Sequence, residues 1–453
     1  MQTPFEAYFT SLQGKQIAVL GLGVSNRPLV RLLLEFGCQV IGCDRTPREK
    51  LDAEVLELER MGCRLRTGDS YLEDLQADVV FRTPGMHPGN PALELLRSRG
   101  ARITSEMDVF FQVCPCDILA VTGSDGKTTT TTLISEMLKG EGKSVWLGGN
   151  IGTPLLSLVP QMKPEDVAVV ELSSFQLMDM TRSPRVAVVT NLSPNHLDVH
   201  KDMEEYVAAK CNIFRFQDEL GKLVLNADNA LTAAMAGNGT TRFFSRQGKG
   251  HVQLKDGWIT RDGVPVLDTA AIAIPGVHNI ENYMAAILAV EGMVSDDTIR
   301  QVAKTFGGVE HRIEFVREKD GVRYYNDSIA SSPSRTIAGL HSFSQKVILI
   351  AGGYDKQIPF DVLGPEICKS VKKLYLNGAT AQKIRASVEN TPSYAPGAPA
   401  IWECADFAAA VQAAAAGAEP GDVVLMSPAC AAFDQFKNFM VRGEFYKKLV
   451  MEL

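Results

Sequence analysis

The chain has 453 residues, of which 45% are hydrophobic and 22% charged, and its formal net charge is −7. This length favours about three domains over a single core. The acidic balance without a basic block argues against a nucleic-acid binder, and no apolar run reaches the roughly 18 residues that a membrane span needs. The start of the chain shows no signal-peptide pattern and the nine cysteines are scattered, so we expect a cytoplasmic protein.

The first predicted segment is a β–α–β unit with a glycine turn. It contains a strand over residues 16–20, a helix that Ser25 caps, and a strand over residues 39–44. Asp44 follows the turn Gly21-Leu22-Gly23 by about 20 residues, where a dinucleotide fold places its ribose ligand. Because Asn26 replaces the third glycine of that fingerprint, NAD is the weaker interpretation, and a nucleotide-sugar or another small nucleotide is the stronger one.

Helices and strands continue to alternate up to residue 104. We expect a helix over about 49–61, a strand from 77 that turns at 85, a helix after Asn90 and a last strand near 101–105. Such alternation predicts a mostly parallel sheet with helices around it. We therefore expect a Rossmann-like N-terminal domain over residues 1–104.

The segment Val121-Thr-Gly-Ser-Asp-Gly-Lys-Thr-Thr129 follows an apolar strand and leads into helical residues. Backbone N–H groups of such a glycine loop, together with a helix N-terminus, cradle phosphate. Lys127 offers a positive charge for the β- and γ-phosphates of a nucleotide, and Thr128 offers a hydroxyl for Mg²⁺. Val121 stands where the strict motif has glycine, but the rest of the pattern is intact, so we expect an ATP site.

Polar residues follow further strands of this central P-loop domain, which we place at residues 105–309. Glu171 ends an apolar strand, and an acid in that position beside a phosphate loop holds Mg²⁺ in such folds. His196 lies in a loop after the next apolar strand, which favours a ligand or acid–base role. Lys210 lies on a helix predicted over 202–214 among small apolar residues, where it is either a surface lysine with a buried stem or a desolvated, reactive amine.

A strong helix is expected over residues 281–293. Asn282 on its first turn and Asn279 just before it are candidates to read an adenine edge, although helix capping alone would also explain Asn279. Beyond it, apolar strands predict a Rossmann-like C-terminal domain over residues 310–453, with functional side chains past the strand ends. The strands are expected over 322–327, 346–353, 372–377 and 422–427.

Taken together, these motifs resemble the Mur ligases, the ATP-dependent amide-forming enzymes of peptidoglycan precursor synthesis. The stretches that carry the resemblance stand in the family's order, at 122–128, 171–176, 191–198, 310–312, 326–328 and 427–431. The closing stretch, 434–443, is most similar to the family member that adds D-glutamate. The resemblance implies that ATP phosphorylates the carboxylate of UDP-MurNAc-L-alanine, and that the amine of D-glutamate then attacks the acyl phosphate.

The resemblance also implies roles for individual residues. Catalysis would involve Lys127, His196, Lys210 and Arg312. ATP would contact Gly123, Ser124, Asp125, Gly126, Lys127, Thr128, Thr129, Asn279, Asn282, Arg312 and Asp327. Mg²⁺, expected as two ions, would be held by Thr128, Glu171, His196 and Lys210, with Lys210 carbamylated by CO₂. UDP-MurNAc-L-Ala and D-glutamate would contact Leu22, Ser25, Asp44, Arg45, Thr46, Asn150, His196, Ser331, Lys356, Phe433 and Phe439.

Two positions depart from the family pattern. Ala432 stands where the family has a serine that donates to D-glutamate, and Ile329-Ala-Ser331 stands where it has Lys-Ala-Thr. Contacts to D-glutamate are therefore less well supported than contacts to ATP. The alternatives are a ligase for another amino acid, a folate polyglutamating ligase, or a regulatory P-loop ATPase that only switches conformation. We expect a monomer with no nucleic-acid or membrane partner.

Overall fold

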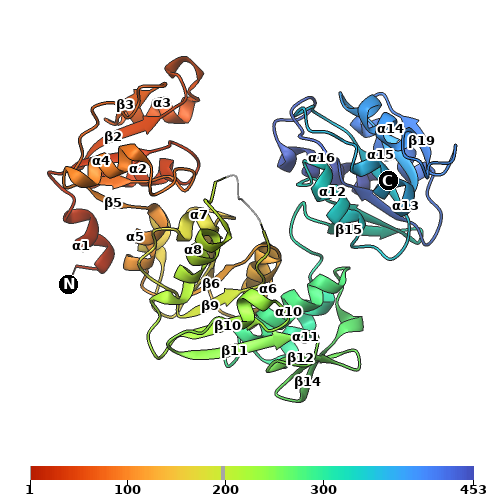
Figure 1. Cartoon of the computed structure of the whole chain (residues 1–453), viewed down its shortest axis with the longest axis horizontal. Helices are drawn as coiled ribbons and strands as arrows, with labels where there is room; N and C mark the ends of the chain where they lie inside the picture. Colours follow the sequence, from red (N-terminus) through yellow and green to blue (C-terminus); the bar gives the residue numbers. More distant parts are fainter. Residues whose placement is uncertain (1, 195–198) are drawn as a thin grey trace. The chain divides into compact units, whose positions relative to one another are not determined.

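The computed structural model describes residues 2–194 and 199–453. It falls into two compact units, Met1–Thr269 with Glu281–Val302 and Ala270–Ile280 with Ala303–Leu453, and each unit is described by itself. The strands of the described residues form three sheets in which most neighbours are parallel (Figure 1). The predicted α/β class is thus confirmed. The domain boundaries near residues 104 and 309 stay predictions.

The N-terminal sheet has the strand order β3-β2-β1-β4-β5, and all of these strands are parallel. Its elements are α1 (Pro4–Thr10), β1 (Gln16–Leu20), α2 (Asn26–Glu35), β2 (Gln39–Asp44), α3 (Ala53–Arg60), β3 (Arg64–Thr67), β4 (Val79–Phe81), α4 (Pro91–Ser98) and β5 (Arg102–Thr104). The sequence did not predict α1 and β3. The helix expected from residue 49 begins only at α3, because the Asp52 carboxylate accepts the N–H of Val55 and caps the helix there.

Side chains of β1 alternate between the two faces of this sheet. Ile17 and Val19 belong to the same core as Leu29 of α2, whereas Leu20 belongs to the same core as Leu93 of α4. This period of two is that of a buried strand with helices on both faces. Since β1 and β4 are parallel neighbours, the loops that follow them leave the sheet at the same edge.

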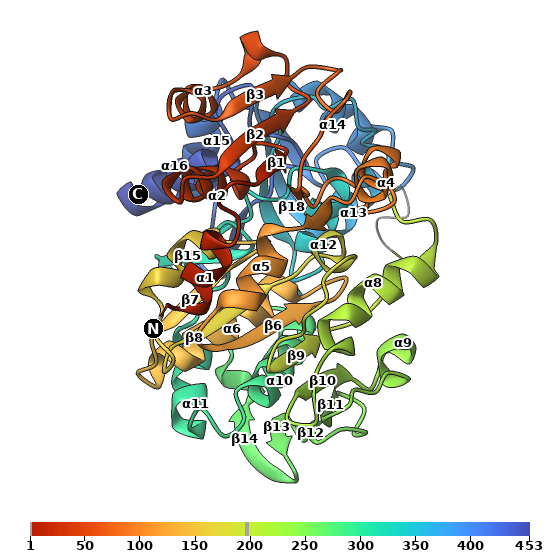
Figure 2. The same ribbon diagram turned by 90° about the vertical axis from the view of Figure 1, so that its left-hand side faces the viewer.

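The second sheet of the first unit has the order β14-β13-β12-β11-β10-β9-β6-β8-β7, and only the pairs β12–β13 and β13–β14 are antiparallel. The elements are α5 (Glu106–Val113), β6 (Asp117–Thr122), α6 (Lys127–Gly140), β7 (Val145–Gly149), β8 (Val167–Glu171), α7 (Ser174–Leu177), β9 (Val186–Val189), α8 (Met203–Arg215), β10 (Lys222–Asn226), α9 (Ala230–Ala233), β11 (Thr240–Ser245), β12 (Val252–Lys255), β13 (Trp258–Arg261) and β14 (Val264–Asp268). Because β6 lies between β8 and β9, the ends of three strands surround the predicted phosphate loop. Figure 2 shows α6 and α8 alongside these strands.

Two helices, α10 (Val277–Ala289) and α11 (Asp296–Thr305), follow this sheet in the chain. The predicted start of the first of them at residue 281 was wrong by about one turn. Gly276, with a φ of +100°, precedes α10, and nothing in the next four residues prevents a helix. Asn282 consequently lies on the second turn. Asn279 lies inside the helix, where its side-chain amide donates to the carbonyl of Pro275 at 2.5 Å, so it is not a helix N-cap.

The sheet of the second unit has the order β15-β16-β20-β17-β18-β19, and only the β15–β16 pair is antiparallel. Its elements are β15 (Glu314–Lys319), β16 (Val322–Asn326), α12 (Pro333–Leu340), β17 (Val347–Ala351), α13 (Leu363–Ser370), β18 (Val371–Leu376), α14 (Ala381–Glu389), β19 (Ala400–Glu403), α15 (Phe407–Ala416), β20 (Val423–Met426) and α16 (Phe439–Glu452). Leu349 lies in the core that also contains Leu363 and Ile384, and Ile350 in the core that contains Phe407. Helices therefore cover both faces, as in a doubly wound fold.

No helix among the described residues is long and apolar enough to cross a membrane. All nine cysteines are free thiols.

Candidate active site

The phosphate loop runs from the end of β6 to the start of α6, as predicted. Gly123 has a φ of +148° and Gly126 a φ of +77°. A Cβ on Gly123 would lie 2.0 Å from the hydroxyl of Thr190, and one on Gly126 would lie 2.3 Å from Oδ1 of Asn282. Both positions thus require glycine for backbone conformation and for space. The structure also brings Asn282 against this loop, where its predicted contact with the nucleotide stays a prediction.

Residues to which the sequence analysis gave no role hold this loop in shape. The N–H of Asp125 donates to the side chain of Asn191 at 3.0 Å, and the Thr190 hydroxyl donates to the carbonyl of Asp125 at 2.6 Å. The Ser124 hydroxyl lies 2.8 Å from the Tyr206 hydroxyl of α8. The loop is therefore fastened from the end of β9 and from α8. Nothing in the local sequence of Tyr206 indicates this contact, because the two residues lie 82 positions apart.

Lys127 and Thr128 are the first two residues of α6. The Lys127 ammonium donates to the carbonyl of Ser124 at 2.9 Å, so its side chain folds back over the loop. Thr128 is buried at the helix start. The N–H groups and the positive end of the helix dipole meet the lysine charge at one point, and this combination favours a phosphate group.

Glu171 at the end of β8 has the environment of a metal ligand. It is 1% exposed, and Oε1 accepts from the Asn150 amide at 2.8 Å. Oε2 is buried and has no hydrogen-bond partner among the described residues. An ionised buried oxygen without a partner is costly, and a hard cation such as Mg²⁺ satisfies it. The residues present thus fit Mg²⁺. Asn150 holds the Glu171 carboxylate in place, while its predicted substrate contact stays a prediction.

Lys210 is buried within α8, so the structure excludes a surface lysine. Its ammonium donates to the carbonyl of Gly123 at 2.8 Å and to the Thr122 hydroxyl at 3.2 Å. Burial, together with repulsion from Lys127, holds the pKa of Lys210 well below its usual value, although the Glu171 carboxylate partly opposes this shift. The amine is therefore predisposed to its neutral, nucleophilic form.

His196, the remaining predicted catalytic residue of this unit, lies outside the described residues.

The N-terminal glycine loop is closed by its own acid. The Asp44 carboxylate accepts the N–H of Leu22 at 2.7 Å and that of Thr46 at 2.8 Å. Burial alone would raise the pKa of Asp44, but these two donors outweigh it and hold that pKa below its usual value. Ser25 precedes α2, as predicted, but its side chain makes no capping hydrogen bond. The Arg45 side chain is largely exposed.

In the second unit, Asp327 follows β16 and is buried. Its carboxylate accepts from the Ser427 hydroxyl at 2.7 Å and from the N–H of Ile313 at 3.3 Å. Burial raises the pKa of Asp327 to about 7. Arg312 is the neighbour of Ile313 in the chain, and its charge acts on the same carboxyl in the lowering direction. Contact of Arg312 and Asp327 with the nucleotide stays a prediction.

The predicted D-glutamate residues lie in the loops after β16, β17 and β20 and, in the case of Phe439, at the first position of α16. Phe433 is exposed and lies edge-on to Tyr354, with ring centroids 5.8 Å apart. Lys356 is exposed two residues further along the loop. The rings of Phe439 and His311 lie edge-on, with centroids 5.9 Å apart. Ser331 is half-buried. These loops share one edge of the sheet, but the structure does not test their contact with an amino acid.

Comparison with known proteins identifies the family. Residues 121–290 match the model of the Mur ligase middle domain, and residues 311–430 match that of the Mur ligase glutamate ligase domain. A protein of Acetivibrio thermocellus named UDP-N-acetylmuramoylalanine--D-glutamate ligase is 50% identical over 461 residues, which cover 99% of both chains. The protein of that name from Clostridium kluyveri is 48% identical over the full length of both chains.

Solved structures share the fold at low sequence identity. The UDP-N-acetylmuramate-alanine ligase MurC of Thermotoga maritima superposes with a TM-score of 0.58 at 18% identity and covers 97% of this chain and 99% of its own. The MurF ligase of the same organism, solved in complex with ADP, gives a TM-score of 0.55 at 19% identity and covers 92% of this chain and 96% of its own.

Proposed function

The chain belongs to the Mur ligase family, and we propose that it joins D-glutamate to UDP-N-acetylmuramoyl-L-alanine in an ATP-dependent step of peptidoglycan precursor synthesis. The observation that carries this proposal is the full-length identity to ligases named for that substrate pair. The geometry supports it, because the phosphate loop, Glu171 and Lys210 converge at the ends of three adjacent strands.

The chemistry requires activation of a carboxylate. A carboxylate repels nucleophiles and offers no good leaving group, so its oxygen takes the γ-phosphoryl group of ATP, with release of ADP. The amine of D-glutamate then attacks the carbonyl carbon, and phosphate leaves from the tetrahedral intermediate as the amide forms. Lys127 and the N–H groups at the start of α6 hold the phosphate oxygens on which negative charge gathers.

Mg²⁺ would be held by Thr128 and Glu171, and by Lys210 as a carbamate, with His196 as the remaining predicted ligand. When bound, it neutralises charge on the transferring phosphoryl group. For carbamate formation, the neutral amine of Lys210 adds to the carbon of CO₂ and releases one proton. The lowered pKa of Lys210 favours that reaction, because only the unprotonated amine has a free electron pair.

The substrate side of the proposal rests on predicted contacts. Residues 22–25 and 44–46 would take the UDP-sugar, and Asn279, Asn282, Arg312 and Asp327 would take ATP. Lys356, Phe433 and Phe439 would surround D-glutamate, with Ser331 near the substrates. A monomeric state and a cytoplasmic location remain predictions.

A panel of amino acids tests the reaction. The purified protein with ATP, Mg²⁺ and UDP-MurNAc-L-alanine should release ADP and form product with D-glutamate. L-Alanine with UDP-MurNAc, and diaminopimelate with the D-glutamyl product, should give none. A product with either of those pairs and none with D-glutamate would overturn the proposal. ATP hydrolysis that is independent of the UDP-sugar would favour a regulatory ATPase.

A further inference from the structure

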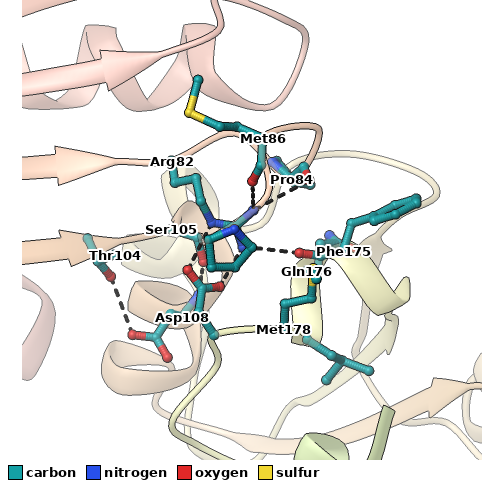
Figure 3. A network of polar contacts seen from close by, with 12 residues as sticks. Arg82, Pro84, Met86, Thr104, Ser105, Asp108, Phe175, Gln176 and Met178 are labelled. Carbon is teal, nitrogen blue, oxygen red and sulfur yellow. Dashed lines mark hydrogen bonds and ion pairs between the residues drawn. The ribbon is translucent and has the colours of Figure 1, made fainter. Parts of the chain in front are cut away.

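Arg82 follows β4 directly, and none of the roles above involves it. Its side chain is fully buried, at 0% exposure, against an Asp179 side chain that is 20% exposed. The guanidinium Nε donates to Asp179 Oδ2 at 2.9 Å, and Nη2 donates to the other carboxylate oxygen and to the carbonyl of Phe175 at 3.1 Å. Nη1 donates to the carbonyl of Met86 at 2.6 Å (Figure 3) and to that of Thr83 at 3.1 Å.

These contacts use all five N–H donors of the guanidinium. Two of them form the forked pair with a carboxylate, the geometry in which arginine is most directional. A buried charge that has lost its partner is strongly unfavourable, so the pair holds its partners in one relative position. The burial of Arg82 also excludes direct contact with a substrate.

One side of this network is the predicted N-terminal domain, whose glycine loop is expected to bind the UDP-sugar. Arg82 fixes the turn from Thr83 to Met86, in which the N–H of Met86 also donates to the carbonyl of Thr83 at 3.1 Å. This turn lies against the glycine loop, since a Cβ on Gly21 would lie 3.0 Å from Cβ of Thr83. The two loops follow the neighbouring strands β1 and β4. Arg82 thus supports the loop predicted to hold the UDP-sugar.

The other side is the segment that follows Glu171, the predicted metal ligand. The helix α7 begins three residues after Glu171, and the N–H of Leu172 donates to the carbonyl of Val121 in β6 at 2.9 Å. The side chain of Asn212 donates to the carbonyl of Leu177 at 2.8 Å. Asn212 lies two residues after Lys210 on α8. The segment that contacts Arg82 therefore continues directly from the strand that carries Glu171, and it is hydrogen-bonded to β6 and to the helix that carries Lys210.

A second set of hydrogen bonds, from an N–H and a hydroxyl group, joins the same parts. Asp108 of α5 accepts the N–H of Thr181 at 3.1 Å and the hydroxyl of Thr104 at 3.3 Å. The His87 ring nitrogen also lies 3.3 Å from a Glu205 carboxylate oxygen on α8, and the two parts share one hydrophobic core. Among these contacts the Arg82–Asp179 pair combines a fully buried charge with a forked geometry, so it constrains the relative orientation of the two parts most directly.

We propose that Arg82 and Asp179 are positioning residues that set the distance between the UDP-sugar loop and the site where the acyl phosphate forms. This inference rests on the proposed ligase function. A substrate held at one end by the N-terminal loop must present its carboxylate at the other end within about 3–3.5 Å of the reacting phosphorus. A small tilt between the two sites is harmless to binding of either nucleotide alone but moves the reacting atoms apart.

The test compares Asp179→Asn, Arg82→Lys and the double variant with the unchanged protein. For each, kcat, the KM of the three substrates, the Kd of UDP-MurNAc-L-alanine alone and the thermal midpoint are measured. We expect kcat to fall about 10- to 100-fold, with both nucleotide affinities within threefold. The double variant should lose no more than the worse single one, because both act through one pair.

Arg242→Gln is the matched control. Arg242 is also mostly buried, at 19% side-chain exposure, and pairs with Asp262 and Glu291 away from both sites. The Arg242→Gln variant should have a lower thermal midpoint than the unchanged protein and a kcat within threefold of it. Folded Arg82 or Asp179 variants that keep full kcat would overturn the inference, as would a loss confined to the KM of the UDP-sugar. Absence of D-glutamate ligation in the unchanged protein would instead refute the proposed function.

Discussion

The loop after β1 and the loop after β6 both run from the carboxyl end of a parallel strand through two glycines into a helix. In the first, the Asp44 carboxylate takes up the N–H of Leu22, and Arg27 donates to the carbonyl of the same residue at 2.8 Å. The side chains of Asp44 and Arg27 therefore already bond to the N–H and the carbonyl of Leu22 in this loop. This arrangement suits a ligand recognised by shape and by single hydrogen bonds.

In the second loop, lysine side chains take the place of the acid. Lys127 stands at the helix start, and Lys210 donates to the carbonyl of Gly123 from beneath. Glu171 Oε2, which has no hydrogen-bond partner in the part of the chain that the structure describes, lies at the end of the neighbouring strand. The comparison shows that this strand–glycine–helix topology supplies only the cradle, and that the residues around it decide between binding a nucleotide and transferring its phosphoryl group.

The largest effect should come from Lys127→Met. Loss of the ammonium removes a charge that stabilises the transferring phosphoryl group, so kcat should fall by about 10³-fold, with binding of UDP-MurNAc-L-alanine unchanged. ADP release in a coupled assay and calorimetric titration of the UDP-sugar measure the two quantities. Lys139→Met is the control on the same helix, because Lys139 pairs only with exposed Glu136. A Lys127 variant that retains a tenth of the activity would contradict the distinction between the loops.

Lys210→Ala should lower kcat by about 100-fold, the scale of losses at metal-supporting residues. If the residue acts as a carbamate, then a small carboxylate such as acetate can enter the space left and should partly restore activity. Lys222→Ala is a matched control, because Lys222 is also mostly buried and has a pKa lowered first by burial. Acetate should not affect it. Full activity of Lys210→Ala without acetate would refute the carbamate.

The sequence predicted the phosphate loop, Glu171 and the parallel sheets because these depend on local patterns, namely strand periodicity and the residues that follow strand ends. It did not predict the contact of Asn150 with Glu171 or that of Arg82 with Asp179, which join residues 21 and 97 positions apart. No local pattern encodes such pairs. The burial of Lys210 was left open for the same reason, since it depends on how α8 packs against β6 and β9.

The helix α10 shows a different kind of failure. Its predicted start at residue 281 was late by about one turn, and Asn279, for which capping was one explanation, lies inside the helix and donates to the carbonyl of Pro275. An asparagine can either cap a helix start or, from inside the helix, donate to the carbonyl four residues earlier. The sequence alone therefore does not define where the helix begins.

A smaller effect is expected for Asp44→Asn in the first loop. The amide keeps the size of the side chain but loses the charge that strengthens the hydrogen bonds from Leu22 and Thr46. The KM for the UDP-sugar should rise about tenfold, since one charge-assisted hydrogen bond contributes roughly 1.5 kcal/mol. The kcat and the KM for ATP should stay within twofold. A fall in kcat equal to that of Lys127→Met would erase the contrast between the loops.

The smallest effect on catalysis is expected at Glu106, in the helix α5 that leads from the sheet of the first loop to the sheet of the second. Burial raises the pKa of Glu106 from 4.5 to about 7, against the opposing hydrogen bond from the N–H of Leu156. Between these pH values the unfolded chain releases a proton that the folded protein keeps, so this group's contribution to stability is full below pH 4.5 and is lost as the pH rises to 7.

Glu106→Gln should abolish that loss, because the amide oxygen can still accept from Leu156 and carries no charge to bury. The variant should unfold at nearly the same urea concentration as the unchanged protein near pH 4.5. At pH 8 it should be more stable by about 3 kcal/mol, the equivalent of a rise from 4.5 to about 7 in the pKa, and kcat should be unchanged. Equal midpoints of the two proteins at pH 8 would show that Glu106 is not held in its neutral form. The helix α5, which joins the two sheets, would then hold Glu106 in its charged form despite the burial of that side chain.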